Sequence, residues 1–437
     1  VQAAEEGGCR MSFSTWIPII MMVLTFALNI PVTYGMVAAG AFYLLYTSAD
    51  LGIVVGQVMG TMYTGYVLMA IPLFIFTANV MNSGKVTDAM FDFSKAAVGK
   101  KRGALAYVNV LISLIFSGMT GSAIADAAGM GLMEIKAMEK DGYDLPFSCA
   151  ITAATATIGP IFPPSIPFVI YAMLSGTSVG ALFLGGVVPA ILIAVALSLY
   201  IAYVSQKRKY PEGIKFSPRE FWRFTLRALP ALLTPVILLA GIYTGVMTPT
   251  EAGAIAALYA LIISVFVYRI LGWKEFQQTV KDTAFSTGSI TILTAAAAVF
   301  SYIVAKEKIP DMVSDFMLGI TDNKIVLLLI INALFLVLGM FLDTAVLQYV
   351  FLPMVIPIVR VLGIDMVHFG VLICLNMMIG LSTPPFGFLL FVTANIAKTS
   401  LSAVVREVLP MVGVLLVVLM LLTFVPQLVL FVPSLMG

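Results

Sequence analysis

Charged residues are scarce in this chain: they make up 11% of 437 residues, whereas hydrophobic residues make up 61%. Soluble domains carry about 25% charged residues, so this chain has too little polar surface to stay in water. With one histidine, a histidine-ligated metal centre is excluded, and three scattered cysteines argue against a disulfide framework. The net charge of +2 gives no reason to expect nucleic acid as a partner. The composition predicts an all-α polytopic protein of the lipid bilayer.

Apolar runs of about 20 residues, the length that crosses a bilayer core as a helix, recur along the chain. We predict ten crossings, near residues 16–35, 37–58, 61–82, 149–172, 180–205, 228–247, 251–271, 284–305, 367–394 and 409–431. The polar residues 1–10, before Met11, are interpreted as an N-terminal extension or linker.

The basic residues predict the orientation of these crossings. The loop 85–102 holds five basic and two acidic residues, and the loop 206–227 holds seven and two. Cytoplasmic loops concentrate Lys and Arg, so both loops are predicted inside. The loop 306–324 holds three basic and four acidic residues and is predicted outside.

Counting crossings then predicts two re-entrant hairpins. Only two crossings separate the two inside loops, so the segment 104–132 must enter and leave by the same face. The same reasoning makes 325–352 re-entrant from the outer face. Non-helical tips at membrane depth are tolerated only where protein buries them or where they line a cavity.

The chain also repeats itself at an offset of 221 residues. The string IGPIFPP at 158–164 returns as IGLSTPP at 379–385, and twelve identities fall without a gap across residues 118–189. Matches of Gly, Pro and Asp carry weight because these residues set backbone geometry or carry charge. Together with the charge pattern this indicates an inverted repeat whose halves each contain a Pro-broken helix, which is typical of secondary transporters.

The tips and breaks are the candidate sites. Thr120 and Ser122 place hydroxyl groups at the first tip. Prolines between residues 159 and 165 prevent a continuous helix, so freed carbonyls can bind Na⁺ and half-helix N-termini can face an anion. Small residues at the tip also fit plain helix packing.

Acidic residues inside apolar segments are further candidates. Asp343 is the only acid between Ile325 and Ile358, and such a carboxylate costs several kcal/mol without a partner or cation. We predict that it lies near a bound cation or orders the second tip. Asp126 is its parallel in the first half, or else a helix cap.

Other polar residues are assigned structural roles. Glu251, behind Pro249, fits a helix N-terminus. Asp144 and Asp365 are predicted N-caps, and His368 a loop or interface residue. The segment 215–230 mixes aromatic and basic residues, which predicts an interfacial helix or, alternatively, a plain basic loop.

Four strings carry a family resemblance: GSAIADAAG at 121–129, IGPIFPPSIP at 158–167, TPTEAG at 248–253 and GLSTPPFG at 380–387. They resemble the large membrane subunit of tripartite ATP-independent periplasmic (TRAP) transporters, over about residues 11–437. The resemblance implies Na⁺-coupled uptake of a small organic anion, of the sialic-acid or C4-dicarboxylate class, across the bacterial inner membrane. It also implies an elevator mechanism, a small four-helix membrane subunit and a periplasmic substrate-binding protein.

The resemblance also implies sites and domains. Sodium would bind first at Thr120, Ser122, Gly159 and Phe162, and second at Asp343, Thr344, Ala345, Gly380 and Thr383. The substrate would lie near Ser122, Asp126, Pro163, Pro164, Asp343, Pro384 and Pro385. Scaffold and arm helices would occupy 11–103, the first transport half 104–205, a basic loop and second scaffold half 206–324, and the second transport half with the terminal helix 325–437.

Two other readings compete with this one. A stand-alone carboxylate carrier driven by Na⁺ or H⁺ would share the same architecture, although proton coupling usually needs buried titratable groups, and only Asp126 and Asp343 are well placed. An intramembrane enzyme would need a catalytic constellation, and the sequence contains no HExxH motif.

Overall fold

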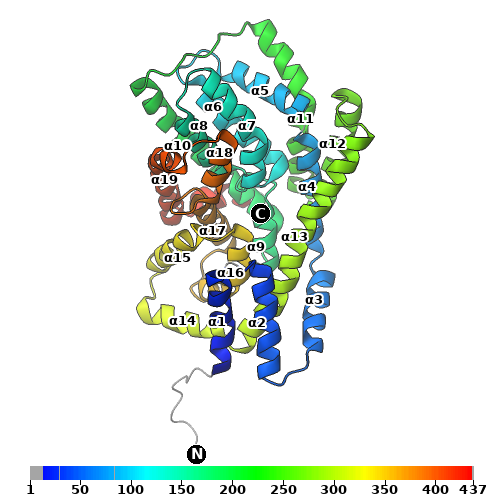
Figure 1. The fold of residues 1–437 in the computed structure, drawn as a ribbon, viewed down its shortest axis with the longest axis vertical. Coiled ribbons are helices and arrows are strands. Elements are labelled where there is room, and N and C mark those ends of the chain that lie inside the picture. The colour runs from blue at the N-terminus through cyan, green and yellow to red at the C-terminus, as the bar shows by residue number, and fades with distance from the viewer. Residues whose placement is uncertain (1–12, 29, 83, 436–437) are drawn as a thin grey trace, which may run out of the picture.

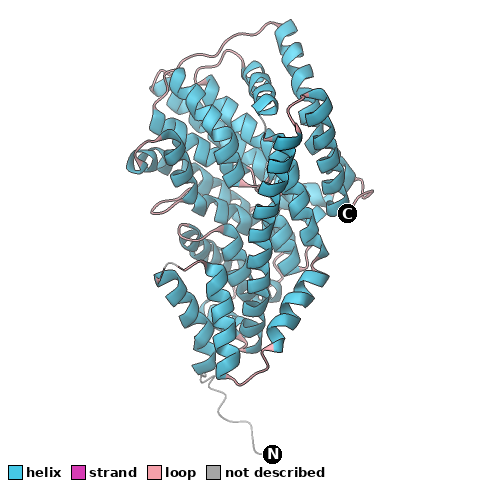
Figure 2. Ribbon diagram, turned by 45° about the vertical axis from the view of Figure 1, so that its right-hand side comes forward, coloured by secondary structure: helices cyan, strands magenta, loops and turns pink. Residues whose placement is uncertain are grey.

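A computed structural model describes residues 13–28, 30–82 and 84–435 of the chain. Every regular element in these ranges is helical, apart from one isolated antiparallel bridge between Arg102 and Glu212. The helices form an elongated bundle, with α1 to α3 at the lower end in Figure 1. Figure 2, coloured by secondary structure, shows helices joined by loops throughout.

The N-terminal helices are shorter and more numerous than predicted. The segment holds α1 (Phe13–Ala27), α2 (Val32–Tyr46), α3 (Gly52–Thr64), the 3₁₀ turn η1 (Tyr66–Met69) and α4 (Ala70–Met81). The predicted boundary near residue 36 is wrong, because Pro31 stands at the N-cap of α2, where its missing N–H costs nothing. A 63° bend at Gly65 separates α3 from η1 and α4.

Two predicted loops contain helices. Residues 85–102 include α5 (Gly84–Val98), and 306–324 include α14 (Ile309–Ile320). Both segments were predicted to be loops from their charged residues alone, and both predictions are wrong. In α5, Val86, Ala89 and Met90 are fully buried at helical spacing, and such a stripe stabilises a helix by packing.

The helices in the middle of the chain are long. They are α11 (Pro218–Tyr243), α12 (Pro249–Ile262) continued by a π-helical turn (Ile263–Val267), and α13 (Trp273–Lys306). The amphipathic segment 215–230 is helical from Pro218 and continues into α11 without a break, so the alternative of a plain basic loop is wrong, and its place in the membrane interface stays a prediction. Capping boxes at the N-termini of α11 and α12, Ser217 with Glu220 and Thr248 with Glu251, satisfy orphan amides. The structural role predicted for Glu251 is confirmed.

Two stretches of the chain have the same order of elements. The first comprises α6 (Ala104–Thr120), α7 (Ala123–Lys140), α8 (Leu145–Thr155) with the 3₁₀ turn η2 (Ala156–Ile158), α9 (Ile166–Ser175) and α10 (Val179–Lys207). The second comprises α15 (Lys324–Gly339), α16 (Thr344–Val361), α17 (Met366–Leu381), α18 (Phe388–Ala397) and α19 (Leu401–Phe424). Adding 221 to both ends of α7 gives the ends of α16. The hairpins and broken helices lie where predicted, and their inverted, re-entrant placement stays a prediction.

The last predicted crossing, 409–431, has different bounds. Helix α19 ends at Phe424, and Pro426 caps the separate helix α20 (Gln427–Ser434). His368, predicted in a loop or interface, is buried in α17, where its Nε2 lies 2.9 Å from the Leu422 carbonyl oxygen. Asp365 caps α17 as predicted. Asp144 precedes α8 without a capping bond and accepts from Arg208 and Tyr210 instead.

The helices sort into two packing groups. Helix α12 packs against α4 and α11, while α13 packs against α2, α3 and α4. In the second group α8 packs against α7, α18 and α19, and α17 packs against α15. Helices α14 and α13 meet α16, and α4 meets α6, where the groups adjoin. The predicted domain boundaries at 103, 205 and 324 stay predictions.

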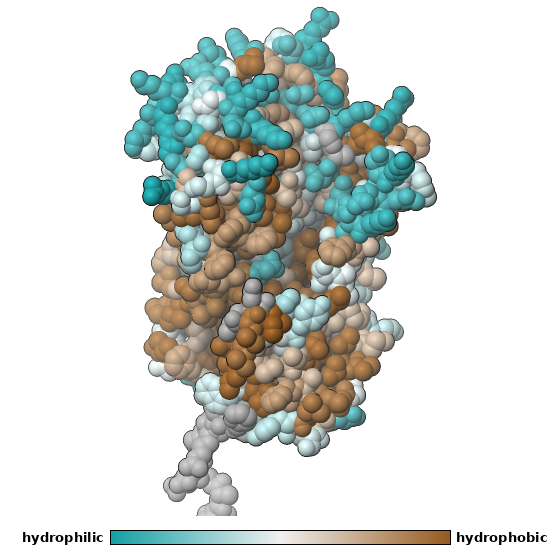
Figure 3. Space-filling model, viewed as in Figure 1, coloured by the Kyte–Doolittle hydropathy of each residue, from teal (hydrophilic) through white to brown (hydrophobic). Residues whose placement is uncertain are grey.

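Six helices among the described residues are long and apolar enough to cross a membrane, or seven if the bent pair α3 and α4 counts as one. The broken helices predicted at 149–172 and 367–394 are each two short apolar helices. Figure 3 shows hydrophilic side chains gathered at the upper end and right side of the molecule, and hydrophobic ones over the rest of that face. The fold is therefore that of a polytopic all-α membrane protein.

Candidate functional site: two hairpin tips against two broken helices

The first tip, residues 120–122, is a buried reversal of the chain between α6 and α7. Gly121 takes a left-handed conformation, with φ of 59°, and its N–H bonds the Ser117 carbonyl. Ser122 then caps α7 by accepting from the Ala125 N–H. The Thr120 hydroxyl donates to the Phe116 carbonyl of the same helix, α6, at 3.4 Å.

This first tip lies directly on the first helix break. A Cβ on Gly121 would stand 2.5 Å from the Pro164 carbonyl oxygen, and the Ile166 N–H donates to the Gly121 carbonyl at 3.4 Å. A Cβ on Gly159 would be 3.6 Å from the Ser122 backbone. The fold therefore brings together the predicted sodium residues Ser122 and Gly159. The ring of Phe162 lies near Gly118, in the last turn of α6 before the tip.

The break itself is held open by proline and serine. Helix α8 passes through η2, and Ser165 begins α9 by accepting from the Phe168 N–H while its hydroxyl donates to the Pro160 carbonyl. The Pro163–Pro164 peptide bond is cis. Both prolines are buried. The first tip and break thus present two serine-capped helix N-termini, of α7 and α9, whose exposed amides and dipoles favour an anion.

Asp126 lies one turn into α7 from the tip. It is 2% exposed, its Oδ2 has no hydrogen-bond partner among the described residues, and the Ser113 hydroxyl of α6 lies beside it. It is not the N-cap, which is Ser122, so the alternative of a capping role is wrong.

The second tip, residues 340–343, lies between α15 and α16. Asp343 caps α16 by accepting from the Ala345 N–H at 2.9 Å, so its predicted role of ordering this tip is what the geometry shows. The Thr344 hydroxyl is buried and has no partner within the described part of the chain. A buried hydroxyl without a partner is costly, and it points to a ligand or water that the site accommodates.

The second tip lies on the second helix break. A Cβ on Gly380 would stand 2.8 Å from the Gly339 Cα, so the two backbones touch. The Gly387 N–H donates to the Met340 carbonyl at 3.3 Å, and the rings of Phe341 and Phe386 lie 5.7 Å apart. The Thr383 hydroxyl donates to the Ile379 carbonyl at 2.6 Å. The Pro384–Pro385 bond is cis, as in the first break.

The two breaks are joined, and their exposure differs. The Ser382 hydroxyl donates to the Ala153 carbonyl at 3.2 Å, linking the end of α17 to α8. Asp343 and Pro385 are exposed, whereas Ser122 and Pro164 are not. The predicted sodium and substrate residues therefore fall into two tip-and-break pairs. Their roles as ligands stay predictions.

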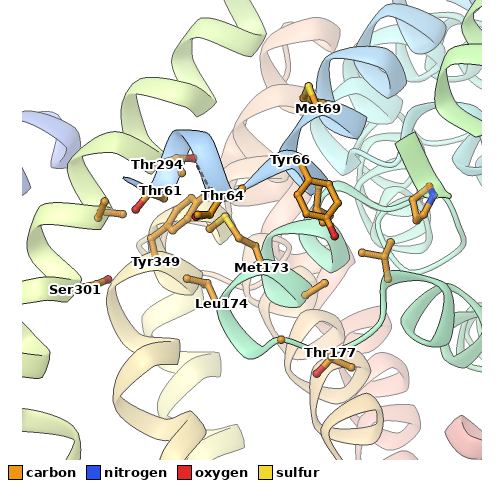
Figure 4. Close-up of a pocket in the computed structure, with 18 of the residues that line it drawn as sticks. Thr61, Thr64, Tyr66, Met69, Met173, Leu174, Thr177, Thr294, Ser301 and Tyr349 are labelled. Atoms are coloured by element: carbon orange, nitrogen blue, oxygen red, sulfur yellow. Dashed lines mark hydrogen bonds between the residues drawn. The ribbon is translucent and has the colours of Figure 1, made fainter. Parts of the chain in front are cut away.

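A cavity of about 1280 Å³ lies elsewhere, between the two packing groups. Its walls come from α3, η1, the end of α9, the start of α10 with the loop before it, the start of α12, the C-terminal third of α13 and the middle of α16. Figure 4 shows hydroxyl-bearing side chains around it, including Thr61, Thr177, Ser301 and Tyr349, and the bond between Tyr349 and Thr294. None of the predicted site residues lines it. The sequence carried no signal for it, because its residues come from seven separate elements.

Comparison with known proteins decides the family. The family model described as the DctM component of the tripartite ATP-independent periplasmic transporter matches residues 19–428. The chain belongs to this family. The DctM proteins are the large permease components of their transporters and not enzymes. The chain is accordingly a multi-pass protein of the bacterial inner membrane.

Three DctM-family relatives illustrate the likeness. The chain is 41% identical to the sialic acid TRAP transporter large permease protein SiaM of Vibrio cholerae, covering 93% of this chain and 95% of that protein. It is 36% identical to the sialic acid TRAP transporter permease protein SiaT of Haemophilus influenzae, covering 97% of this chain and 69% of that one. It is 36% identical to the C4-dicarboxylate TRAP transporter large permease protein DctM of Pseudomonas aeruginosa, covering 85% and 87%.

Solved transporter structures share the DctM fold at low identity. The YdaH transporter of Alcanivorax borkumensis superposes with a TM-score of 0.63 at 15% identity, covering 95% of this chain and 97% of that one. The MtrF protein of Neisseria gonorrhoeae gives 0.60 at 12% identity, covering 96% of each chain. These likenesses concern the fold alone.

Proposed function

We propose that this DctM-family permease couples Na⁺ to the uptake of a small organic carboxylate, of the sialic-acid or C4-dicarboxylate class. The observation that carries the proposal is the pairing of each hairpin tip with one broken helix, through Gly121 with Pro164 and Gly339 with Gly380. Relatives named for sialic acid and for C4-dicarboxylates support the substrate class.

Sodium fits the atoms that these pairs offer. Na⁺ is a hard cation and takes oxygen ligands, and unwound backbone carbonyls supply them in broken helices. The first pair offers hydroxyl and carbonyl oxygens of Thr120, Ser122, Gly159 and Phe162. The second offers the unpartnered Thr344 hydroxyl, the Asp343 carboxylate, the Thr383 hydroxyl, and backbone oxygens of Ala345 and Gly380.

An anionic substrate fits the helix N-termini at the same place. Helices α7, α9 and α16 begin at the tips and breaks, so their unpaired amides can face a carboxylate. Sodium bound beside Asp343 would offset the repulsion between the Asp343 carboxylate and the carboxylate of the substrate. The substrate then lies near Ser122, Asp126, Pro163, Pro164, Asp343, Pro384 and Pro385.

An elevator movement is consistent with the packing. The tips and breaks belong to one packing group, which meets the scaffold helices α4, α13 and α14 along a limited set of elements. The 1280 Å³ cavity lies between the groups. We propose that the group with the tips slides against the scaffold and carries substrate and sodium with it.

A small membrane subunit and a periplasmic binding protein complete the proposed transporter. Helix α3 has no buried residue, and Gly56 and Gly60 on it have open space where a Cβ would stand. Small residues four apart let membrane helices approach closely. The small four-helix subunit is proposed to cover this helix, and the binding protein to deliver substrate from the outer side.

Reconstitution tests the proposal. Proteoliposomes would contain this chain with the small subunit, and uptake would be measured with the binding protein and an inward Na⁺ gradient present or omitted. We expect uptake to need both. Asp343→Ala and Ser122→Ala should reduce it at least tenfold, whereas Asp322→Asn, in an exposed loop, should not. Uptake without binding protein, or driven by a proton gradient alone, would support a stand-alone carrier instead.

A further inference from the structure

Helix α7 contains a second buried acid, Glu134, in addition to Asp126 of the proposed substrate site. Its side chain is 2% exposed, and its Oε1 has no hydrogen-bond partner within the described ranges. It lies two turns beyond Asp126 on the same helix, with Ile135 and Met138 buried around it. Membrane proteins bury acids of this kind at ion and proton pathways.

Nothing that packs around Glu134 supplies a counter-charge. Helix α6 brings only Tyr107 as a titratable group and α8 only Cys149, whereas α18 and η2 bring none. On α5, Lys85 donates to the Tyr268 carbonyl, Lys95 stacks on Phe91, Asp92 faces Arg227, and Asp88 is exposed.

On α7 itself Asp126 is buried and repels a negative charge on Glu134, and the other charged neighbours point outward. Lys136, Glu139 and Lys140 are exposed. No ion pair in the described part of the chain involves Glu134. A buried carboxylate without a partner is expensive, so the side chain must bind a cation.

A proton is the cation that this environment can accept. The described residues hold no group of three or more His, Cys, Asp or Glu side chains that could bind a metal ion, and apolar side chains flank Glu134. A metal ion needs several oxygen ligands, whereas a proton needs one carboxylate oxygen.

Two hydroxyl groups lie on the helices that pack against α7 between Glu134 and the tip. The Cγ2 methyl of Thr152 of α8 lies against Gly131, one turn from Glu134, while its hydroxyl accepts from the Asn109 amide at 2.7 Å. The Ser113 hydroxyl follows one turn later on α6, beside Asp126. In the other direction, six residues separate Glu134 from the end of α7, which is about 9 Å of helix. Glu134 thus lies between the tip and the base of the hairpin.

From this placement we propose that Glu134 is a proton-binding site of the first hairpin, and that it binds a proton and releases it to the cytoplasm in each transport cycle. The proton accompanies Na⁺ and does not replace it. The inference rests on the proposed function for the existence and inward direction of transport and on the predicted orientation of the first hairpin, whereas the binding group and the species bound are different from those at the tips.

The test is proton movement during uptake. The complete transporter, with its membrane subunits and binding protein, would be reconstituted with a luminal pH dye and with the membrane potential clamped. Wild-type uptake should acidify the lumen. Glu134→Gln, which keeps size and removes the proton site, should lower acidification per substrate about tenfold while uptake keeps its Na⁺ dependence. Its uptake rate should also lose its pH dependence.

Two further variants make the outcome decisive. Glu139→Gln removes an exposed acid from the same helix and should acidify the lumen like the wild type. Glu134→Asp keeps a titrating carboxyl and should retain acidification, which covers the case in which Glu134→Gln fails to fold. Wild-type uptake without acidification, or unchanged acidification in Glu134→Gln, overturns the inference and leaves sodium coupling intact. Loss of Na⁺ dependence in the wild type would instead overturn the proposed function.

Discussion

Gly339 and Gly380 touch through their backbones, where the second tip meets the second broken helix. The Gly380 Cα would lie 3.2 Å from a Cβ on Gly339, and a Cβ on Gly380 would lie 2.8 Å from the Gly339 carbonyl carbon. Neither backbone can yield as a flexible side chain would. The absence of both side chains is therefore what allows α15 and α17 to form the second proposed sodium site.

Gly380→Ala should separate this tip from its break. Overpacking between two backbones costs about 1–3 kcal/mol, and the displaced carbonyls should bind sodium at least tenfold more weakly. Thermal unfolding with and without Na⁺ measures both effects. Gly413→Ala on α19, where a Cβ meets nothing within 4 Å, is the matched control. Unchanged sodium stabilisation in Gly380→Ala would contradict the assignment.

Gly121→Ala should damage the first tip for two reasons that controls can separate. The left-handed φ of 59° costs an Ala about 1 kcal/mol, and the new Cβ would stand 2.5 Å from the Pro164 carbonyl oxygen. Gly142→Ala has the same kind of positive φ but open space around it. We expect loss of uptake for Gly121→Ala alone, with both variants losing some stability. Equal uptake in the two variants would show that the contact with Pro164 is dispensable.

Arg208 joins three separate elements at the end of α10. It donates to Glu407 of α19 at 2.8 Å and to Asp144, before α8, at 3.2 Å, and it also reaches the Tyr210 hydroxyl. Because about a third of its side chain is exposed, Arg208→Gln should cost only about 1 kcal/mol. That loss should shrink in high salt. Arg219→Gln, at a residue outside any ion pair in the described chain, is the control and should leave the unfolding temperature unchanged. An equal change of the unfolding temperature in both variants would contradict the stabilising role of Arg208.

Glu307, between α13 and α14, should make stability depend on acid pH. Burial opposes its charge, but hydrogen bonds from Tyr43, Thr15 and Ser14 outweigh it and lower the pKa of Glu307 below its usual value of 4.5. A carboxyl whose folded-state pKa is depressed stabilises the fold above its unfolded pKa, and this contribution is lost as pH falls through the folded pKa.

Tyr43→Phe should remove part of that contribution. We expect about 1 kcal/mol less stability at pH 7 and a smaller further loss on acidification below pH 4.5, measured by chemical unfolding across pH. Tyr302→Phe is the control. Lys306 contacts the rings of both Tyr43 and Tyr302, but of these two tyrosines only Tyr43 donates to Glu307. An identical pH profile for Tyr43→Phe and the wild type would remove Glu307 from this role.

Local features of the fold were accessible from sequence because single residues determine them. Prolines stop helices wherever they stand, so the breaks after Ile158 and Leu381 were predictable. Capping residues such as Thr248 with Glu251 act within one turn. Charge patterns were less reliable. The basic residues of α5 predicted a loop, although Val86, Ala89 and Met90 form a buried stripe at helical spacing. The sequence likewise carries no signal for Glu134, because the exposed Lys136, Glu139 and Lys140 beside it are typical of a solvated helix end.

The amino-acid sequence by itself determined the membrane class, the repeat, the positions of the tips and breaks and the family, because composition, proline and glycine act locally. Only the tertiary structure decided which tip meets which break, that Asp343 caps α16, and that Glu134 is buried with no hydrogen-bond partner for its Oε1 among the described residues. It also decided where the 1280 Å³ cavity lies. These features depend on contacts between helices far apart in the chain, whose distances follow from the packing of whole elements and leave no pattern in neighbouring residues.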